Sequence, residues 1–310
     1  MIVVVIPAVA LAVMSLAAFM GRWVWWLDVL ANFRAQYVVA LAILGLLVTL
    51  SKWRKTGYAI LGVALVNLVA VLPLFIGSPA DPEPATSSVR VMSFNLLSVN
   101  ESYSDVIDYI DAVDPDIVLL HEASRPWEVA MESAGLDYEI IRPRSEEIIF
   151  GTLVLVHGEG IEAVSYGFEA GSPRAVEVSF TPKGWSQPLS VLGTHPLAPT
   201  DEDRAALRDA QLGFAGQWAE DRPGAHLIAG DFNSTPWSWP FRRLLDLGEL
   251  RNSQVGFGLQ PSFSSQSNLL LRVPIDHLVH SVDLEVTDRQ LGPPLGSDHF
   301  PLLVDLQLAG

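Results

Sequence analysis

Three long apolar runs dominate the N-terminal part of the chain, in residues 2–20, 37–50 and 58–76. A helix needs about 20 apolar residues, within a range of roughly 17–25, to cross a membrane. The first and third runs reach this length directly, and the second reaches it with a few flanking residues. The pattern therefore predicts a membrane anchor of three transmembrane helices in residues 1–77.

Charged residues beside these runs predict how the anchor is oriented. Lys52, Arg54 and Lys55 crowd the second connection, which is expected to face the cytoplasm because basic loops stay on that side. The N-terminus then lies inside, and the third helix exits to the outside. The first run could instead be a cleaved signal peptide, but it lacks a basic segment before it and a clear cleavage site, which favours a retained helix. We expect a multi-pass protein of the cell membrane with an extracytoplasmic second domain.

Residues 78–88 are rich in proline and carry no basic side chain. This composition predicts a semi-extended linker that holds the next domain off the membrane surface. The second domain then covers residues 89–310.

The second domain shows both strand-like and helix-like patterns. Short apolar runs predict strands, and longer runs with apolar residues three or four positions apart predict helices. Strands are expected in residues 89–97, 116–120, 147–157, 174–181, 189–193 and 226–233, from 275 onward, and in 301–308. Helices are expected in residues 105–113, 201–220 and 237–247.

Charge and composition narrow the classes of function. The 310 residues carry a formal charge of −16 and include no cysteine, so any metal site uses oxygen and nitrogen ligands. Residues 1–77 hold five basic residues against the single acid Asp28, which leaves −20 for the remainder. So acidic a domain disfavours tight binding of duplex DNA, because nonspecific affinity comes from Lys and Arg that neutralise phosphates. A small or locally held phosphate ester is still compatible with this charge.

Predicted strands repeatedly end in a residue that suits a metal or a phosphate. In the clearest case, Asp231 and Asn233 follow the apolar run that ends at Gly230, and their shared strand parity lets both point into one pocket. Any one such residue also has an ordinary interpretation as part of a turn. Their shared placement indicates a site, since ligand sites in α/β sheets lie at strand ends. The other strand-end candidates are Asn95, Glu122, His195, Asp276, Asp298 and His299.

Together these segments resemble the endonuclease/exonuclease/phosphatase superfamily over residues 89–308, and in particular bacterial members with several N-terminal spans. The motifs are Ser93-Phe-Asn95-Leu, His121-Glu122, Gly193-Thr-His195-Pro, Gly230-Asp-Phe-Asn233, Ile275-Asp-His277 and Ser297-Asp-His299-Phe-Pro301. The resemblance implies an α+β fold, a DNase I-like four-layered α/β sandwich, behind the three transmembrane helices. It also implies a divalent-metal-dependent phosphoesterase site at one end of the sandwich.

The resemblance further implies a metal site for Mg²⁺ or Mn²⁺. Glu122 would be the principal ligand, with Asn95 assisting and Asp298 nearby. Mg²⁺ commonly takes one or two carboxylates plus waters and substrate phosphate, which suits so sparse a set. His121 departs from the family pattern, which usually has Gln at this position. The resemblance therefore does not predict which contact the side chain beside Glu122 makes.

The remaining residues receive reaction roles from the same resemblance. Asp231 would orient or deprotonate the attacking water, and Asn233 would bind the phosphoryl oxygens. His299 would be a general base or a phosphate contact, in a tautomer held by Asp276. His195 would stabilise the transition state or protonate the leaving oxygen.

Four further residues have less certain places. His277 has strand parity opposite to Asp276 and is expected to be structural. Arg174 is a candidate phosphate clamp, although an ordinary surface arginine is the favoured interpretation. Trp237 and Trp239 either line the mouth of the site or pack in the core.

These inferences favour a metal-dependent hydrolase of phosphodiester or phosphomonoester bonds, tethered to the membrane. Its expected partners are the membrane and a phosphate-ester substrate, such as a lipid headgroup, a nucleotide or a nucleic acid. The alternative is a non-catalytic membrane-anchored binding or receptor module that retains the fold. Retention of Glu122, Asp231, Asp276 and His299 speaks against that alternative, because a decayed site loses such residues.

Overall fold

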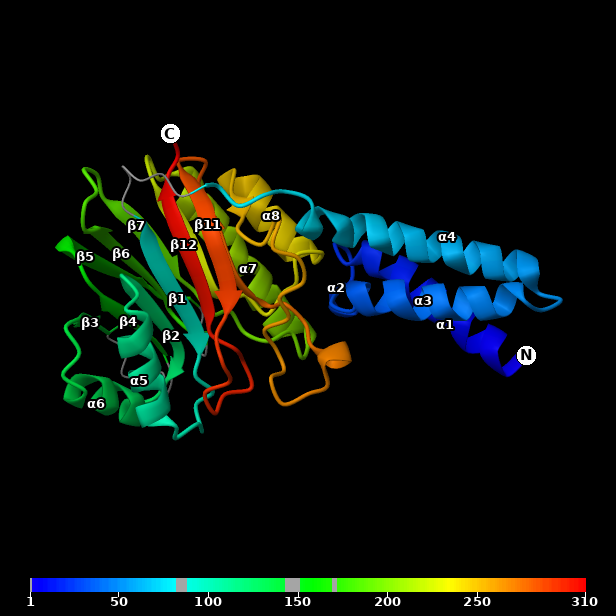
Figure 1. Cartoon of the computed structure of the whole chain (residues 1–310), viewed down its shortest axis with the longest axis horizontal. Helices are drawn as coiled ribbons and strands as arrows, with labels where there is room; N and C mark the ends of the chain where they lie inside the picture. The colour runs from blue at the N-terminus through cyan, green and yellow to red at the C-terminus, as the bar shows by residue number, and fades with distance from the viewer. Residues whose placement is uncertain (1, 82–87, 143–150, 169–171) are drawn as a thin grey trace.

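The structure is a computed structural model that describes residues 2–81, 88–142, 151–168 and 172–310. A bundle of apolar helices stands at one end of a β-sandwich domain (Figure 1). The bundle consists of α1 (Ile2–Ala17), η1 (Ala18–Met20), α2 (Trp25–Ala31), α3 (Arg34–Thr49), α4 (Arg54–Val71) and η2 (Leu72–Phe75).

The bundle contains helices long and apolar enough to cross a membrane. In the described residues, Ile2–Met20 and Arg54–Phe75 meet this requirement by length and composition. A third span exists only if α2 and α3, which meet at a bend of 67°, count as one. The apolar helices were thus predicted correctly, whereas the expected count of three depends on how this bent pair is treated.

The core of the bundle contains closely packed apolar side chains and one series of hydrogen bonds between polar side chains. Ala8, Leu41 and Ala64 are buried where α1, α3 and α4 meet. Beside them, Arg34 Nη1 donates to Asn67 Oδ1 at 3.1 Å, and Asn67 Nδ2 donates to Ser15 Oγ at 3.1 Å. Hydrogen bonds of this kind help hold helices together in an apolar medium, where hydrophobic burial gives no driving force.

Among the described residues, the strands of the second domain form two six-stranded sheets. The first has the order β11-β12-β1-β2-β4-β3 and consists of β1 (Val89–Asn95), β2 (Ile117–Ala123), β3 (Glu139–Ile141), β4 (Gly151–Val156), β11 (Leu284–Leu291) and β12 (Leu302–Leu308). The second has the order β5-β6-β7-β8-β10-β9 and consists of β5 (Glu159–Tyr166), β6 (Ala175–Thr181), β7 (Leu189–Gly193), β8 (His226–Asp231), β9 (Arg251–Asn252) and β10 (Asp276–His280).

Three buried clusters separate the layers of this domain. One lies between the sheets and contains Leu119 and Leu227. The second lies between the first sheet and the helices α5 (Tyr103–Val113) and α6 (Arg125–Ser133). The third lies between the second sheet and the helices α7 (Glu202–Glu220) and α8 (Trp239–Gly248). Three interfaces imply four layers, which confirms the predicted four-layered α/β sandwich.

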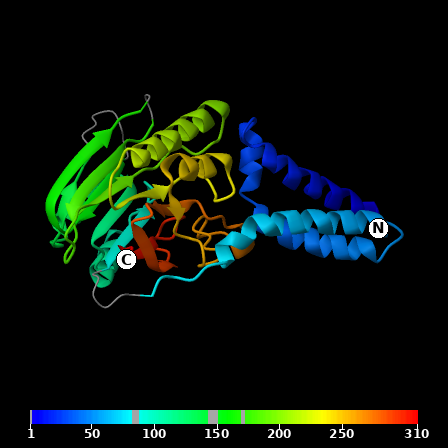
Figure 2. The same cartoon turned by 90° about the horizontal axis from the view of Figure 1, so that it is seen from above.

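The anchor and the domain are in direct contact (Figure 2). Asp28 of α2 is buried, and its carboxylate accepts hydrogen bonds from Arg208 Nη2 at 3.1 Å and from the Trp239 backbone N–H at 2.7 Å. Arg208 Nη1 in turn donates to the backbone oxygen of Asn233 at 3.2 Å. Removing one partner of such a buried ion pair destabilises the folded protein by about 3–5 kcal/mol, because the other charge is left buried and unpaired. The domain therefore packs directly against the helix bundle, whereas its distance from a membrane surface stays a prediction.

The linker itself is only partly described, since residues 82–87 lie outside the described ranges. Ala80, near its start, donates its backbone N–H to Val286 of β11 at 2.9 Å. The chain thus returns to the domain directly after the anchor.

Several elements differ from the sequence prediction. The strand expected in residues 147–157 is described only from Gly151, where β4 begins, because residues 147–150 lie outside the described ranges. The pattern also missed α6, β3, β5 and β11. β5 is largely exposed on both faces, so it lacks the apolar alternation that identifies a half-buried strand.

Candidate active site

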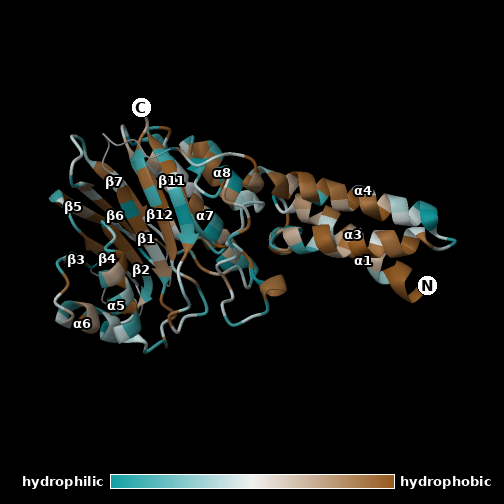
Figure 3. Cartoon of the chain, viewed as in Figure 1, coloured by the Kyte–Doolittle hydropathy of each residue, from teal (hydrophilic) through white to brown (hydrophobic). Residues whose placement is uncertain are grey.

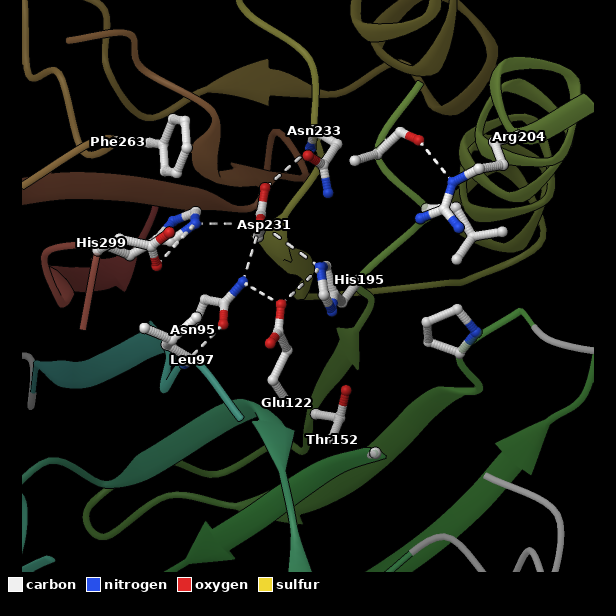
Figure 4. A pocket seen from close by; sticks show the side chains of 15 residues that line it. Asn95, Leu97, Glu122, Thr152, His195, Arg204, Asp231, Asn233, Phe263 and His299 are labelled. Carbon is white, nitrogen blue, oxygen red and sulfur yellow. Dashed lines mark hydrogen bonds and ion pairs between the residues drawn. The ribbon is translucent and has the colours of Figure 1, made fainter. Parts of the chain in front are cut away.

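The ends of β1, β2 and β8 meet at one end of the sandwich. β1 and β2 run parallel, which places Asn95 beside His121, and β8 faces them from the second sheet. A cavity of about 410 Å³ opens here (Figure 4). Of the predicted site residues, those that line it are Asn95, Glu122, His195, Asp231, Asn233, Asp298 and His299. Asp276 is not in the lining and lies behind His299.

Glu122 and Asn95 are fixed by the backbone around them. Glu122 has a left-handed backbone with φ of 55°, and the pairing of β2 with β4 is irregular between Leu120 and Ala123. Such an irregularity re-aims a side chain, here into the cavity. Glu122 Oε2 accepts the Ser98 backbone N–H at 3.1 Å, and Oε1 accepts from Asn95 Nδ2 at 3.1 Å.

Asp231 lies at the centre of the site. Its Oδ2 accepts from Asn95 Nδ2 at 3.1 Å and lies 3.5 Å from His195 Nε2 and 3.6 Å from His299 Nε2. Its Oδ1 accepts the Asn233 backbone N–H at 2.9 Å. Burial alone would raise the pKa of Asp231, but the two imidazoles and this N–H hold it below its ordinary value. Asp231 is therefore a carboxylate at neutral pH.

His299 is held by a buried carboxylate. Its Nδ1 donates to Asp276 Oδ2 at 2.8 Å, so Nε2 faces Asp231 and the cavity. Burial would lower the pKa of His299, but the charges of Asp276 and Asp231 raise it to about 10. A ring that keeps its proton at neutral pH suits contact with an anionic phosphate better than the role of a base.

His195 lies on the loop after β7 and faces two carboxylates. Its Nε2 is 3.9 Å from Glu122 Oε1, besides its contact with Asp231. Burial would lower the pKa of His195, but the hydrogen bond and charge of Asp231 and the charge of Glu122 raise it. The ring is therefore poised to donate a proton.

The donor set beside Asn95 fits a hard divalent cation. Asn95 Nδ2 donates hydrogen bonds to both Glu122 Oε1 and Asp231 Oδ2, at 3.1 Å in each case. Two carboxylates therefore share a single neutral hydrogen-bond donor. Oxygen ligands of this kind are those that Mg²⁺ prefers. Asp231, Asp276 and His299 also place ligand atoms within 4.8 Å of one another. In that group, however, Asp276 is already hydrogen-bonded to a ring with a raised pKa, which disfavours a metal there.

His121 and Gly230 shape the wall behind the site. His121 is fully buried between Ser93 Oγ at 3.2 Å and Thr152 Oγ1 at 3.0 Å, and burial lowers its pKa to about 3. His121 is thus a neutral ring between two hydroxyls, which indicates a structural role at the position where the family usually has Gln. A Cβ on Gly230 would collide with the backbone oxygen of Thr194, so β8 needs glycine where it passes the loop before His195.

The structure also adds and removes candidates. Arg204, in the first turn of α7, lines the cavity and donates through Nε to Ala198 O at 3.1 Å. Phe263 lines it too, with its ring 4.8 Å from that of His299. Neither residue was predicted; a basic side chain in the otherwise acidic first turn of α7 was the available signal. Arg174 donates to Ser165 Oγ at 2.7 Å and is not among the lining residues, which agrees with the favoured interpretation of an arginine outside the site.

The other uncertain residues serve packing. His277 is buried against the rings of Phe232 and Phe241, and its Nε2 lies 2.8 Å from Ser234 O, which agrees with its predicted structural place. Trp237 packs on Val71 and Leu74 of the anchor. It therefore belongs to the contact between anchor and domain and not to the mouth of the site.

Residues 92–299 match the sequence profile described as "Endonuclease/Exonuclease/phosphatase family". The match covers more than half of the chain, and the chain belongs to this family. A search of curated protein sequences found no match.

Solved structures with the same fold include three that illustrate the family. A truncated TDP2 of Caenorhabditis elegans is 18% identical, with a TM-score of 0.58 over 72% of this chain and 98% of that one. ANGEL2, described as a 2',3'-cyclic phosphatase, is 15% identical, with a TM-score of 0.55 over 75% and 99% of the two chains. The human Nocturnin catalytic domain with bound sulfate is 17% identical, with a TM-score of 0.57 over 76% and 99%. At this identity the likeness shows the fold.

Acidification is expected to destabilise the folded chain through two buried histidines. Burial lowers the pKa of His277 to about 3 and of His280 to about 4, against 6.5 ordinarily. Between pH 7 and pH 5 the unfolded chain gains protons that the folded chain does not bind, so stability falls by about 2 kcal/mol per histidine. The H280N variant keeps a donor for Ser281 O and should recover about 2 kcal/mol of this loss. Thermal unfolding at both pH values measures it, and an identical acid-induced loss in both proteins would contradict the assignment.

Proposed function

We propose that this chain is a divalent-metal-dependent hydrolase of phosphodiester or phosphomonoester bonds, tethered to a membrane by its N-terminal helices. The observation that carries the proposal is the arrangement around Asp231: its carboxylate lies within 3.6 Å of Asn95, His195 and His299 in one cavity. Membership of the family supports the same reaction class.

The metal site of the proposal uses Glu122 as its main ligand, with Asn95 and Asp298 beside it. A bound Mg²⁺ or Mn²⁺ would supply charge neutralisation for the phosphoryl oxygens. Glu122 has an oxygen 3.1 Å from the Asn95 amide, and Asp298 lines the same cavity. The Glu122 carboxylate is thus available to a cation that enters from the cavity.

The protein's own groups then divide the remaining work. Asp231, kept as a carboxylate, orients the attacking water and accepts its proton. His299, which keeps its proton, and Asn233 contact the phosphoryl oxygens. His195 donates a proton to the leaving oxygen. Asp276 fixes the ring of His299 and does not touch substrate.

Arg204 adds a second cation to the proposed phosphate site. Its Nε is committed to Ala198 O, which leaves the other guanidinium nitrogens for an anion in the cavity. A planar guanidinium suits the paired oxygens of a phosphate. Arg204 is the only arginine or lysine among the described residues that line the cavity.

The bundle supports the proposed location. The N-terminus and the turn between α3 and α4 lie at the end of the bundle opposite the domain (Figures 1 and 2). That turn is flanked by Lys52, Arg54 and Lys55. Basic turns stay in the cytoplasm, so this arrangement favours an extracytoplasmic catalytic domain.

Turnover by the full chain tests the proposed reaction. We expect Mg²⁺-dependent hydrolysis of a soluble diester, bis(p-nitrophenyl) phosphate, or of the matching monoester, with chelation abolishing it. Glu122→Gln and Asp231→Asn should each lower kcat at least about 100-fold, because each removes a charge that acts at the reacting phosphate. The exposed Glu220→Gln serves as the control for loss of one carboxylate. Equal rates, or no rate with any of the four proteins, would contradict the proposal and favour a non-catalytic binding module.

Labelling of introduced cysteines tests the proposed location, since the chain has no cysteine of its own. In intact cells, a membrane-impermeant maleimide should label Glu220→Cys on the domain. It should label Ser51→Cys in the distal turn only after the cells are permeabilised. The reverse pattern would contradict an extracytoplasmic domain.

A further inference from the structure

A second cavity, of about 560 Å³, lies between the bundle and the domain. We call it the junction cavity. One wall is the start of α3, with Val39 and Ile43; the other is formed by Trp237 and the segment 259–274, with Leu269 and Leu270. Its lining is mostly apolar and is shared by the two parts of the chain.

The leucine turn η3 (Leu269–Leu271) is exposed beside this cavity. Its three side chains are 64%, 67% and 64% exposed. In Figure 3 the turn is coloured as strongly hydrophobic and projects from the domain toward the bundle. Contiguous exposed apolar residues of this kind mark a surface that binds a membrane or another molecule.

The proposed membrane location of α3 decides whether a membrane lipid or another molecule occupies this surface. The outward-facing apolar side chains of α3 continue past the cavity: Ile43 in its wall is 55% exposed, and Leu46 beyond it is 58% exposed. In a membrane-tethered chain these side chains face lipid. The junction cavity is therefore continuous with the lipid-facing side of the same helix, and the molecules that meet it there are bilayer lipids.

Two buried polar atoms at the junction cavity lack partners among the described residues, and one of them, the Trp237 N–H, fits a lipid and not a pure hydrocarbon. Trp237 is 5% exposed, and its indole N–H has no hydrogen-bond partner among the described residues. The side-chain oxygen of Gln36 is likewise buried without a partner in the described part of the chain, while its nitrogen donates to Arg272 O at 3.0 Å. A buried polar group without a partner is costly. The ester or amide linkage of a lipid accepts from an N–H such as that of Trp237.

The same segment also reaches the catalytic cavity. Phe263, near its start, lines that cavity beside His299. The backbone of Phe263 pairs with Val273, next to Arg272. The segment 259–274 thus has one end at the proposed phosphate site and its leucine turn at the anchor.

We propose that the junction cavity binds an acyl chain of a membrane lipid, with Leu269 and Leu270 inserted into the same leaflet, which holds the catalytic cavity at the bilayer surface. The inference rests on the membrane tethering of the proposed function. It adds a lipid-binding site formed jointly by α3 and the segment 259–274.

Photo-crosslinking tests the site in the full chain. The protein is placed in phosphatidylcholine nanodiscs that contain phosphatidylcholine with a diazirine on one acyl chain, and crosslinked peptides are identified by mass spectrometry. We expect adducts on peptides from residues 259–274. Any membrane helix reacts with such a probe, so adducts on α3 alone are what a simple anchor would give, and they overturn the proposal.

Two variants and one control make the result specific. Ile43→Trp fills the cavity and should lower adduct formation on residues 259–274 at least fivefold. Leu270→Asp changes an exposed turn, where folding is not at risk, and should lower it similarly. Val69→Trp enlarges an equally exposed residue of α4 away from the cavity and should leave it unchanged. Equal labelling in all of these proteins would overturn the proposal.

Hydrolysis of the soluble diester in the same samples separates this inference from the proposed function. Turnover without adducts on residues 259–274 contradicts the lipid site and leaves the hydrolase intact. Adducts without turnover support the lipid site and contradict the hydrolase.

Discussion

The site depends on the burial of like charges at the seam between two sheets. Asp231 and Asp276 are almost fully buried and pair across neighbouring strands, and Glu122 joins them from the facing sheet. Their mutual repulsion in a medium of low dielectric constant is opposed by His195, His299 and the Asn95 amide. His299 keeps its proton for this reason, and the pKa of His195 is raised. The remaining negative charge beside Asn95 is what a divalent cation would neutralise.

The helix bundle of residues 1–77 is connected to the same site. Asp28, the single acid of residues 1–77, is buried against Arg208, and Arg208 holds the backbone of Asn233. Asn233 has a left-handed backbone with φ of 48°, a conformation that asparagine adopts more readily than most residues. The segment 259–274 makes a second link between the anchor and the catalytic cavity. Through both connections, the helices contact residues that position the proposed phosphate site.

Much of this arrangement was predictable from the sequence, for a physical reason. Strands such as β8 are buried and end in polar residues, so local pattern locates both the strand and its functional end, and the ordered motifs supplied the fold. Arg204 was missed because its place in the cavity wall, beside Ala198, is set by tertiary contacts. The contact of Asp28 with Arg208 joins residues 180 positions apart, and no local pattern encodes it. For β5 the exposed faces left no apolar alternation to detect.

In the proposed site, the carboxylates and the amide at the ends of β1, β2 and β8 hold one divalent cation. Anomalous diffraction from crystals of the full chain grown with Mn²⁺ would locate this ion. We expect a peak in the catalytic cavity about 2.1 Å from a Glu122 oxygen, within reach of Asn95. A peak between Asp276 and His299 instead, or none in the cavity at saturating Mn²⁺, would contradict it.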